Sequence, residues 1–144
     1  MNTEELTART YEHLGERILE TFRDKAVARD IVTLAGMAEI YCADHHDEAQ
    51  RAPFRSKATE AGVYPARKIP RLCPDCAMHV RYGEVRRALC TRDPRPSCKT
   101  CANHCYAPEE AAWQRTCMSY AGPRAMLRGH AVDAIRHLIQ TRLS

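Results

Sequence analysis

Two tight cysteine clusters constrain this chain more than any other feature of its sequence. Five of its eight cysteines lie in the segments Cys73-Pro-Asp-Cys76 and Cys98-Lys-Thr-Cys101-Ala-Asn-His-Cys105. A Cys-x-x-Cys bend turns the chain back on itself, so that both sulfurs can reach one metal centre. Thiolates are soft ligands, which favours zinc, copper(I) or an iron–sulfur cluster over calcium or magnesium. The sequence therefore predicts a metal site to which these five cysteines contribute.

The spacing of the clusters does not decide which metal is bound. The two outer pairs give C-x2-C-x21-C-x2-C, slightly beyond the roughly 15 to 20 residues common between zinc-binding pairs. The step to Cys105 adds C-x2-C-x3-C, which partly matches the ferredoxin run C-x2-C-x2-C-x3-C-P. Both an iron–sulfur cluster and zinc stay open on spacing alone.

Three further cysteines differ in their surroundings. Cys42 lies at the end of a predicted helix, where it is either a remote ligand or a small core residue. Cys90 lies between the two clusters, which favours a ligand role. Cys117 lies close to the apolar positions of a predicted helix, which favours a core position.

Three histidines lie beside the cysteines. His45 and His46 follow Cys42 and either bind metal or are solvated at a helix terminus. His104 precedes Cys105 and is either a zinc ligand or a hydrogen-bond donor to sulfur, an interaction that tunes the potential of a cluster.

The start of the chain carries no sign of export. MNTEELTART has neither a basic opening nor an apolar run, and no stretch approaches the ~20 apolar residues of a membrane span. We therefore expect a cytoplasmic protein without a membrane segment, in a compartment where thiols stay reduced. A disulfide framework is the less favoured alternative for the even cysteine count.

Charge is distributed unevenly along the chain. Residues 1–50 carry a net charge of −6 and residues 51–144 a net charge of +10, so the basic part surrounds the cysteines. Three explanations for this positive charge stay open: a surface that binds nucleic acid or phosphate, a counter-charge for an anionic thiolate site, or basic side chains that are simply solvated. We expect an unidentified protein partner and leave nucleic acid open as a second kind of partner.

Apolar periodicity predicts helices and no strand, so the fold class is all-α, with cysteine-rich metal-binding loops between the helices. Residues 47–71 lack periodicity and read as a long loop. We divide the chain into an N-terminal helical extension, 1–25, and a cysteine-rich helical domain, 26–144. The helices are expected over 3–24, 26–43, from Cys73 to Cys90, from Tyr106 until Gly122-Pro123 interrupts it, and over 131–142.

No catalytic constellation stands out. The chain has no G-x-S-x-G elbow, no phosphate loop and no H-E-x-x-H helix, so no catalytic residue is predicted. An enzymatic activity is therefore disfavoured, although the question stays open.

Four segments together resemble one small bacterial family, the nitrous oxide-stimulated promoter family of YgbA-like proteins. They are I-Y-C-A-D-H-H at 40–46, L-C-P-D-C at 72–76, C-K-T-C-A-N-H-C-Y at 98–106 and M-S-Y-A-G-P-R-A-M-L at 118–127. The resemblance implies an association with nitrosative stress and denitrification, but no biochemical activity. It also implies a shared set of cysteines, which correspond here to Cys42, Cys73, Cys76, Cys90, Cys98, Cys101 and Cys105.

The leading hypothesis is a cytoplasmic metalloprotein with an iron–sulfur cluster, for example of the 4Fe-4S type, that senses nitric oxide or supports maturation or repair of iron proteins. The alternative is a structural zinc module that binds nucleic acid or a protein partner. A dithiol oxidoreductase using Cys73 and Cys76 is weaker, because the pair does not lie near a βαβ pattern.

Overall fold

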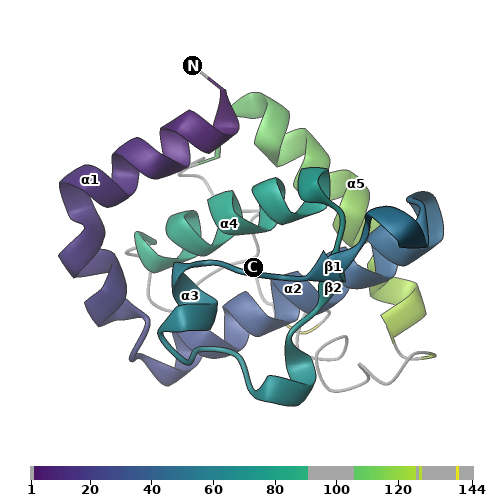
Figure 1. The fold of residues 1–144 in the computed structure, drawn as a ribbon, viewed down its shortest axis with the longest axis horizontal. Coiled ribbons are helices and arrows are strands. Elements are labelled where there is room, and N and C mark those ends of the chain that lie inside the picture. The colour runs from purple at the N-terminus through teal and green to yellow at the C-terminus, as the bar shows by residue number, and fades with distance from the viewer. Residues whose placement is uncertain (1, 91–105, 126, 128–138, 140–144) are drawn as a thin grey trace. The chain divides into compact units, whose positions relative to one another are not determined.

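A computed structural model describes residues 2–90, 106–125, 127 and 139 (Figure 1). The chain forms two compact units, Met1–Leu89 and Cys90–Ser144. Nearly all regular structure in the described residues is helical, which confirms the predicted all-α class. No described helix combines the length and the apolar character that a bilayer crossing requires.

Three long helices form the frame of the first unit. They are α1 (Thr3–Thr21), α2 (Lys25–His45) and α4 (Pro74–Ala88), and α4 packs against both of the others (Figure 1). Their facing sides bury a core that includes Ile18, Ile31, Met37, Val80 and Val85. The predicted N-terminal extension therefore contributes its helix to this unit, because α1 contacts α4 directly.

Side-chain caps set the starts of the first two helices. Asn2 Oδ1 accepts a hydrogen bond from the Glu5 N–H at 2.8 Å, and Asp24 Oδ1 accepts from the N–H groups of Ala26 and Val27 at 2.8 and 3.2 Å. Asp24 has an extended backbone, as an N-cap requires. The first helix therefore ends at Thr21, before the predicted Asp24, and the second runs two residues past the predicted Ala43.

The segment between α2 and α4 is more structured than the predicted loop. Strands β1 (Ala52–Pro53) and β2 (Arg71–Leu72) pair antiparallel, with Ala52 opposite Leu72. The Phe54 N–H extends the pairing to the Pro70 carbonyl at 2.9 Å. In chain order the elements are η1 (Glu48–Gln50), β1 (Ala52–Pro53), α3 (Lys57–Glu60), η2 (Ala66–Lys68) and β2 (Arg71–Leu72). Each of these strands and short helices has at most four residues, which is too few for an apolar periodicity to be recognised in the sequence.

The second unit contains α5 (Pro108–Ala125). The predicted interruption at Gly122-Pro123 is wrong, because the helix continues through Pro123 to Ala125. The fixed φ of proline is compatible with a helix, so the chain can stay helical at the cost of one hydrogen-bond donor and of crowding against the carbonyl four residues earlier. Cys117 is fully buried, as its predicted core position requires. The helix predicted over 131–142 lies outside the described residues, apart from Ile139.

A buried carboxyl group of α4 fixes the segment after β1 to this helix. Glu84 is 0% exposed, and its Oε2 accepts hydrogen bonds from Tyr64 Oη at 2.6 Å and from Ser56 Oγ at 3.1 Å. Its other oxygen, Oε1, is buried and has no hydrogen-bond partner among the described residues. Burial raises the pKa of Glu84 to about 8, although the two hydroxyl donors favour the charged form.

We expect Glu84→Gln to flatten the dependence of stability on pH. The pKa of Glu84 is higher in the folded chain than in the unfolded chain. The folded state therefore binds more protons between about pH 4.5 and 8, and stability falls as pH rises through that range. Urea unfolding at several pH values measures this slope. The exposed Glu16→Gln is the matched control, and an equal slope in wild type and Glu84→Gln would contradict the assignment.

Candidate metal centre

The last turn of α2 presents the first two residues of the site. Cys42 lies on this turn and is fully buried, and His46 is the C-cap residue four positions later. The His46 N–H donates to the Cys42 carbonyl at 2.9 Å, which continues the helical pattern for one more bond. Residues four apart lie on the same helix face, so this turn places a thiol and an imidazole together.

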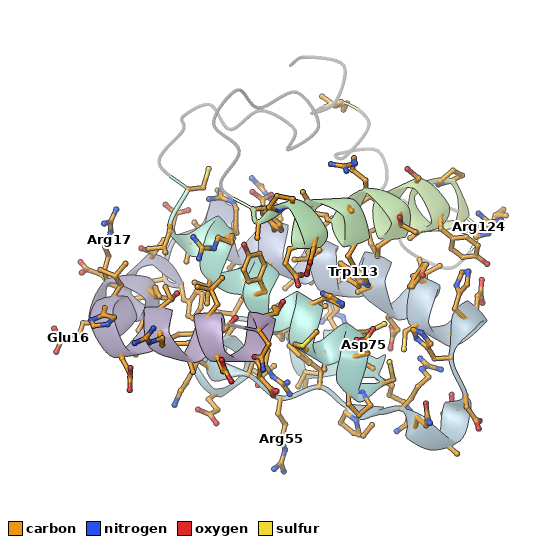
Figure 2. All side chains as sticks on the ribbon, turned by 90° about the horizontal axis from the view of Figure 1, so that it is seen from above. Glu16, Arg17, Arg55, Asp75, Trp113 and Arg124 are labelled. Carbon is orange, nitrogen blue, oxygen red and sulfur yellow. The ribbon has the colours of Figure 1, made fainter. Side chains whose placement is uncertain are left out.

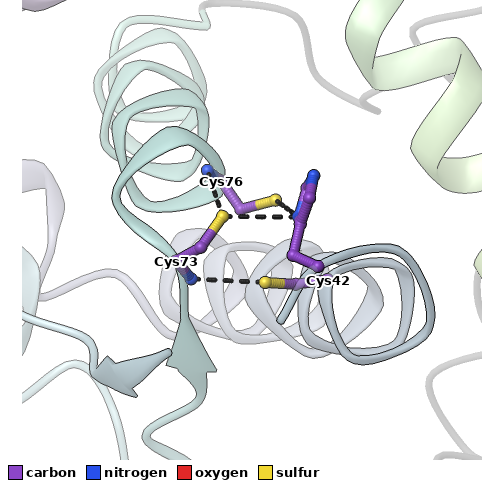
Figure 3. Close-up of side chains that lie close together, drawn as sticks. Cys42, Cys73 and Cys76 are labelled. Atoms are coloured by element: carbon purple, nitrogen blue, oxygen red, sulfur yellow. Dashed lines mark hydrogen bonds between the residues drawn. The ribbon is translucent and has the colours of Figure 1, made fainter. Parts of the chain in front are cut away.

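The first turn of α4 presents the other two residues. Cys73 is the N-cap, and its Sγ accepts a hydrogen bond from the Cys76 N–H at 3.4 Å. Pro74 occupies the next position, where a helix tolerates the missing N–H. The single turn brings both sulfurs to the same end of the helix (Figure 3).

Strand β2 positions this turn against α2. The Arg71 N–H donates to Glu39 Oε2 on α2 at 2.7 Å, two residues before Cys73. Arg51 donates through Nε and Nη2 to the Arg71 carbonyl at 3.3 and 3.0 Å. The Cys73 N–H then donates to Cys42 Sγ at 3.2 Å, which joins the end of α2 to the start of α4 (Figure 3).

The four side chains converge on one point. Their ligand atoms, three Sγ atoms and a ring nitrogen, all lie within 4.8 Å of one another. His46 Nδ1 lies 3.3 Å from Cys73 Sγ and 3.4 Å from Cys76 Sγ. The three cysteines are buried and His46 is half-buried, so the cluster lies below the surface.

Burial acts on the thiols of this cluster. It raises the pKa of Cys42 and Cys76, and the neighbouring sulfurs raise the pKa of Cys76 further. These two groups are therefore neutral thiols when no cation is present. A bound metal ion reverses this preference, because it requires thiolates and displaces their protons.

The spacing of the His46 nitrogen from the sulfurs of Cys73 and Cys76 fits one tetrahedral ion. Metal distances of about 2.3 Å to sulfur and 2.0 to 2.1 Å to nitrogen place tetrahedral sulfurs about 3.8 Å apart and nitrogen about 3.5 Å from sulfur. The observed nitrogen–sulfur distances of 3.3 and 3.4 Å are close to that value. Three cysteines and one histidine also form an established ligand set of tetrahedral sites.

The structure brings together three of the seven predicted ligand residues, Cys42, Cys73 and Cys76. Cys90 follows α4 and is half-buried, and its ligand role stays a prediction. Cys98, Cys101 and Cys105 lie outside the described residues, and so does His104.

Of the two histidines after Cys42, the structure selects His46 for the cluster. His45 instead stacks on Tyr41 with ring centroids 4.2 Å apart, and its Nδ1 lies 2.8 Å from the Tyr41 carbonyl. The sequence carried one unused signal for His46. It follows Cys42 at a spacing of four, as ligands on one face of a helix end do.

A helical fold with cysteines and a histidine clustered between two helix ends defines a class of small cysteine-rich helical proteins with a candidate metal site. Within that class, the family model described as nitrous oxide-stimulated promoter matches residues 25–144, and the chain belongs to this family. The resemblance seen in the sequence motifs is thereby confirmed. Residues 1–24 precede the matched region.

One curated relative shows how far the similarity extends. The uncharacterized protein YgbA of Escherichia coli strain K12 is 36% identical over 62 residues, which are 42% of this chain and 52% of that protein. The match thus spans about half the length of the relative. No solved structure is detectably similar to this chain.

Replacing Cys42 tests whether the cluster binds metal. We expect Cys42→Ala to lose most of the bound metal, because one of four ligands is removed at a buried position. Cys117→Ala is the matched control, since both cysteines are 0% exposed and lie on helices. Metal per chain, measured by elemental analysis, should fall in the first variant alone. Equal metal content in both variants would exclude Cys42 as a ligand.

Proposed function

We propose that this protein binds one metal ion through Cys42, His46, Cys73 and Cys76 and that its thiolates respond to reactive nitrogen oxides. Zinc is the ion that the ligand set favours. The observation that supports the proposal is the convergence of four soft or borderline ligand atoms within 4.8 Å. The metal would join the end of α2 to the start of α4 and stabilise the first unit.

The short distances favour a single ion over a cluster at these four residues. In a 4Fe-4S cluster each protein ligand binds its own iron atom, so the ligating sulfurs must stand farther apart than around one ion. A structural zinc site with three cysteines and a histidine needs no such separation. The leading sequence hypothesis of an iron–sulfur cluster therefore depends on ligands beyond these four.

The link to nitrogen oxides comes from the family description and from thiolate chemistry. Dinitrogen trioxide, which forms from nitric oxide and oxygen, transfers NO⁺ to a thiolate sulfur and releases nitrite. The sulfur then carries an S–NO group and has lost its negative charge, which weakens its bond to the metal. Release of the ion would loosen the junction of α2 and α4, and this loosening is the proposed signal.

Metal analysis of protein purified without oxygen tests the proposal. We expect about one zinc per chain, no colour, and release of the ion when an S-nitrosothiol is added, followed with a chromogenic zinc dye. Cys42→Ala should release less metal because it starts with less, and Cys117→Ala should behave like wild type.

Two results would overturn this assignment. A coloured protein that contains iron and inorganic sulfide would restore the iron–sulfur hypothesis. A protein that takes up neither zinc nor iron would remove the metal from the proposal altogether.

The alternative function, a metal-stabilised module that binds nucleic acid, gains support from one surface feature. Four cations of the segment between α2 and α4 are exposed and have no acidic partner among the described residues. They could contact phosphates, as could the exposed Arg71, which also pairs with Glu48 at 3.2 Å. The four are Arg55, Lys57, Arg67 and Lys68.

Salt dependence measures this alternative directly. If these cations contact phosphates, affinity for a short DNA duplex should fall steeply with salt, and the double replacement Arg67→Gln with Lys68→Gln should reduce the slope by about 2. Fluorescence anisotropy at several salt concentrations gives the slope. The control is Arg17→Gln on α1, and an unchanged slope in the double variant would exclude this surface.

A further inference from the structure

A cavity of about 540 Å³ opens on the first unit beside the start of α4. Its volume falls within the range of small-molecule sites in proteins. Apolar side chains from the β1 segment, from β2 and from α4 supply most of its walls, namely Ala52, Pro53, Phe54, Leu72, Ala77 and Met78. None of these six belongs to the candidate metal cluster.

One arginine in this cavity is held in a fixed orientation. Arg81 Nε donates to the Arg55 carbonyl at 2.8 Å, and its guanidinium carbon lies 5.4 Å from the centre of the Phe54 ring. Its two terminal nitrogens have no hydrogen-bond partner among the described residues. A guanidinium with a free pair of N–H groups can bind carboxylate or phosphate through two parallel hydrogen bonds.

No acidic side chain of the described residues forms an ion pair with Arg81, so its guanidinium can pair with a bound anion. Two carboxylates also line the cavity: Asp75, whose Oδ2 lies 3.7 Å from His79 Nε2, and Glu4, which is exposed on the first turn of α1. The buried Glu84 also interacts with Arg81, and burial raises the pKa of Glu84 to about 8, which favours its neutral form. Arg55 extends away from the ribbon (Figure 2), so the oriented positive charge in the cavity comes from Arg81.

We propose that this cavity binds a small molecule with a carboxylate or phosphate group on an apolar body. The anionic group would pair with the terminal nitrogens of Arg81, and the apolar body would lie against the Phe54, Leu72 and Met78 side of the cavity. The proposal does not depend on a metal ion, because Arg81 is oriented by Arg55 and Phe54.

Three probes of similar shape test the proposal by nuclear magnetic resonance. Benzoate and phenyl phosphate carry the anionic group on an aromatic ring, and benzamide is the neutral counterpart of benzoate. In amide-resolved titrations we expect saturable shifts at Leu72, Ala77 and Met78 with either anion, and the tighter one identifies the preferred group. Benzamide should bind at least about tenfold more weakly, a difference of about 1.4 kcal/mol.

Variants separate the role of Arg81 from general charge. Arg81→Gln should weaken benzoate binding at least about tenfold, Arg81→Lys should be intermediate, and the exposed Arg17→Gln should leave it unchanged. Circular dichroism verifies that each variant is folded. If Arg81→Gln does not fold, the comparison of benzoate with benzamide in wild type still decides. Equal affinity for these two probes, no saturable shift, or unweakened benzoate binding in folded Arg81→Gln would overturn the proposal.

Discussion

The hydrogen bond from the Cys73 N–H to Cys42 Sγ joins the two helix ends on which the candidate site depends. It can form because β2 delivers Cys73 alongside α2, where Glu39 accepts from the Arg71 N–H. Sulfur is a weak acceptor, so this bond alone contributes little. A bound cation would add strong bonds between the same two helix ends. The contact between the end of α2 and the start of α4 would then be much more stable.

The long helices of the first unit could be predicted because their signals are local. The apolar stripes of α1 and α2 recur at helical spacing, whereas the caps Asn2 and Asp24, which set the starts of these helices, were not used, so the first helix was predicted to continue to Asp24. The two-residue strands could not be predicted, because their pairing joins residues about twenty positions apart and no period fits in two residues. Pro123 misled the prediction for α5, since a proline often ends or kinks a helix, whereas its fixed φ is compatible with a helical backbone and α5 continues through it.

The sequence predicted the part of the site that depends on local spacing. It did not predict which distant residues the tertiary structure brings to the site. The Cys-x-x-Cys spacing predicts the bend from Cys73 to Cys76, and both thiols lie at the start of α4. Their meeting with Cys42 and His46 depends on the path of the chain from η1 to β2, which sequence periodicity does not reveal. Histidines 45 and 46 are adjacent in sequence, yet only the backbone at the end of α2 decides which one faces the sulfurs.

Cys73 has two roles, one at the start of α4 and one in the candidate metal cluster, and the two are coupled. Its sulfur accepts a hydrogen bond from the Cys76 N–H at the start of α4, and the same sulfur belongs to the candidate ligand group. Any covalent change at that atom must therefore disturb the first turn of α4 together with the cluster. The adjoining Leu72 and Pro74 line the neighbouring cavity, so a chemical event at one sulfur would be transmitted as a change of shape on the surface.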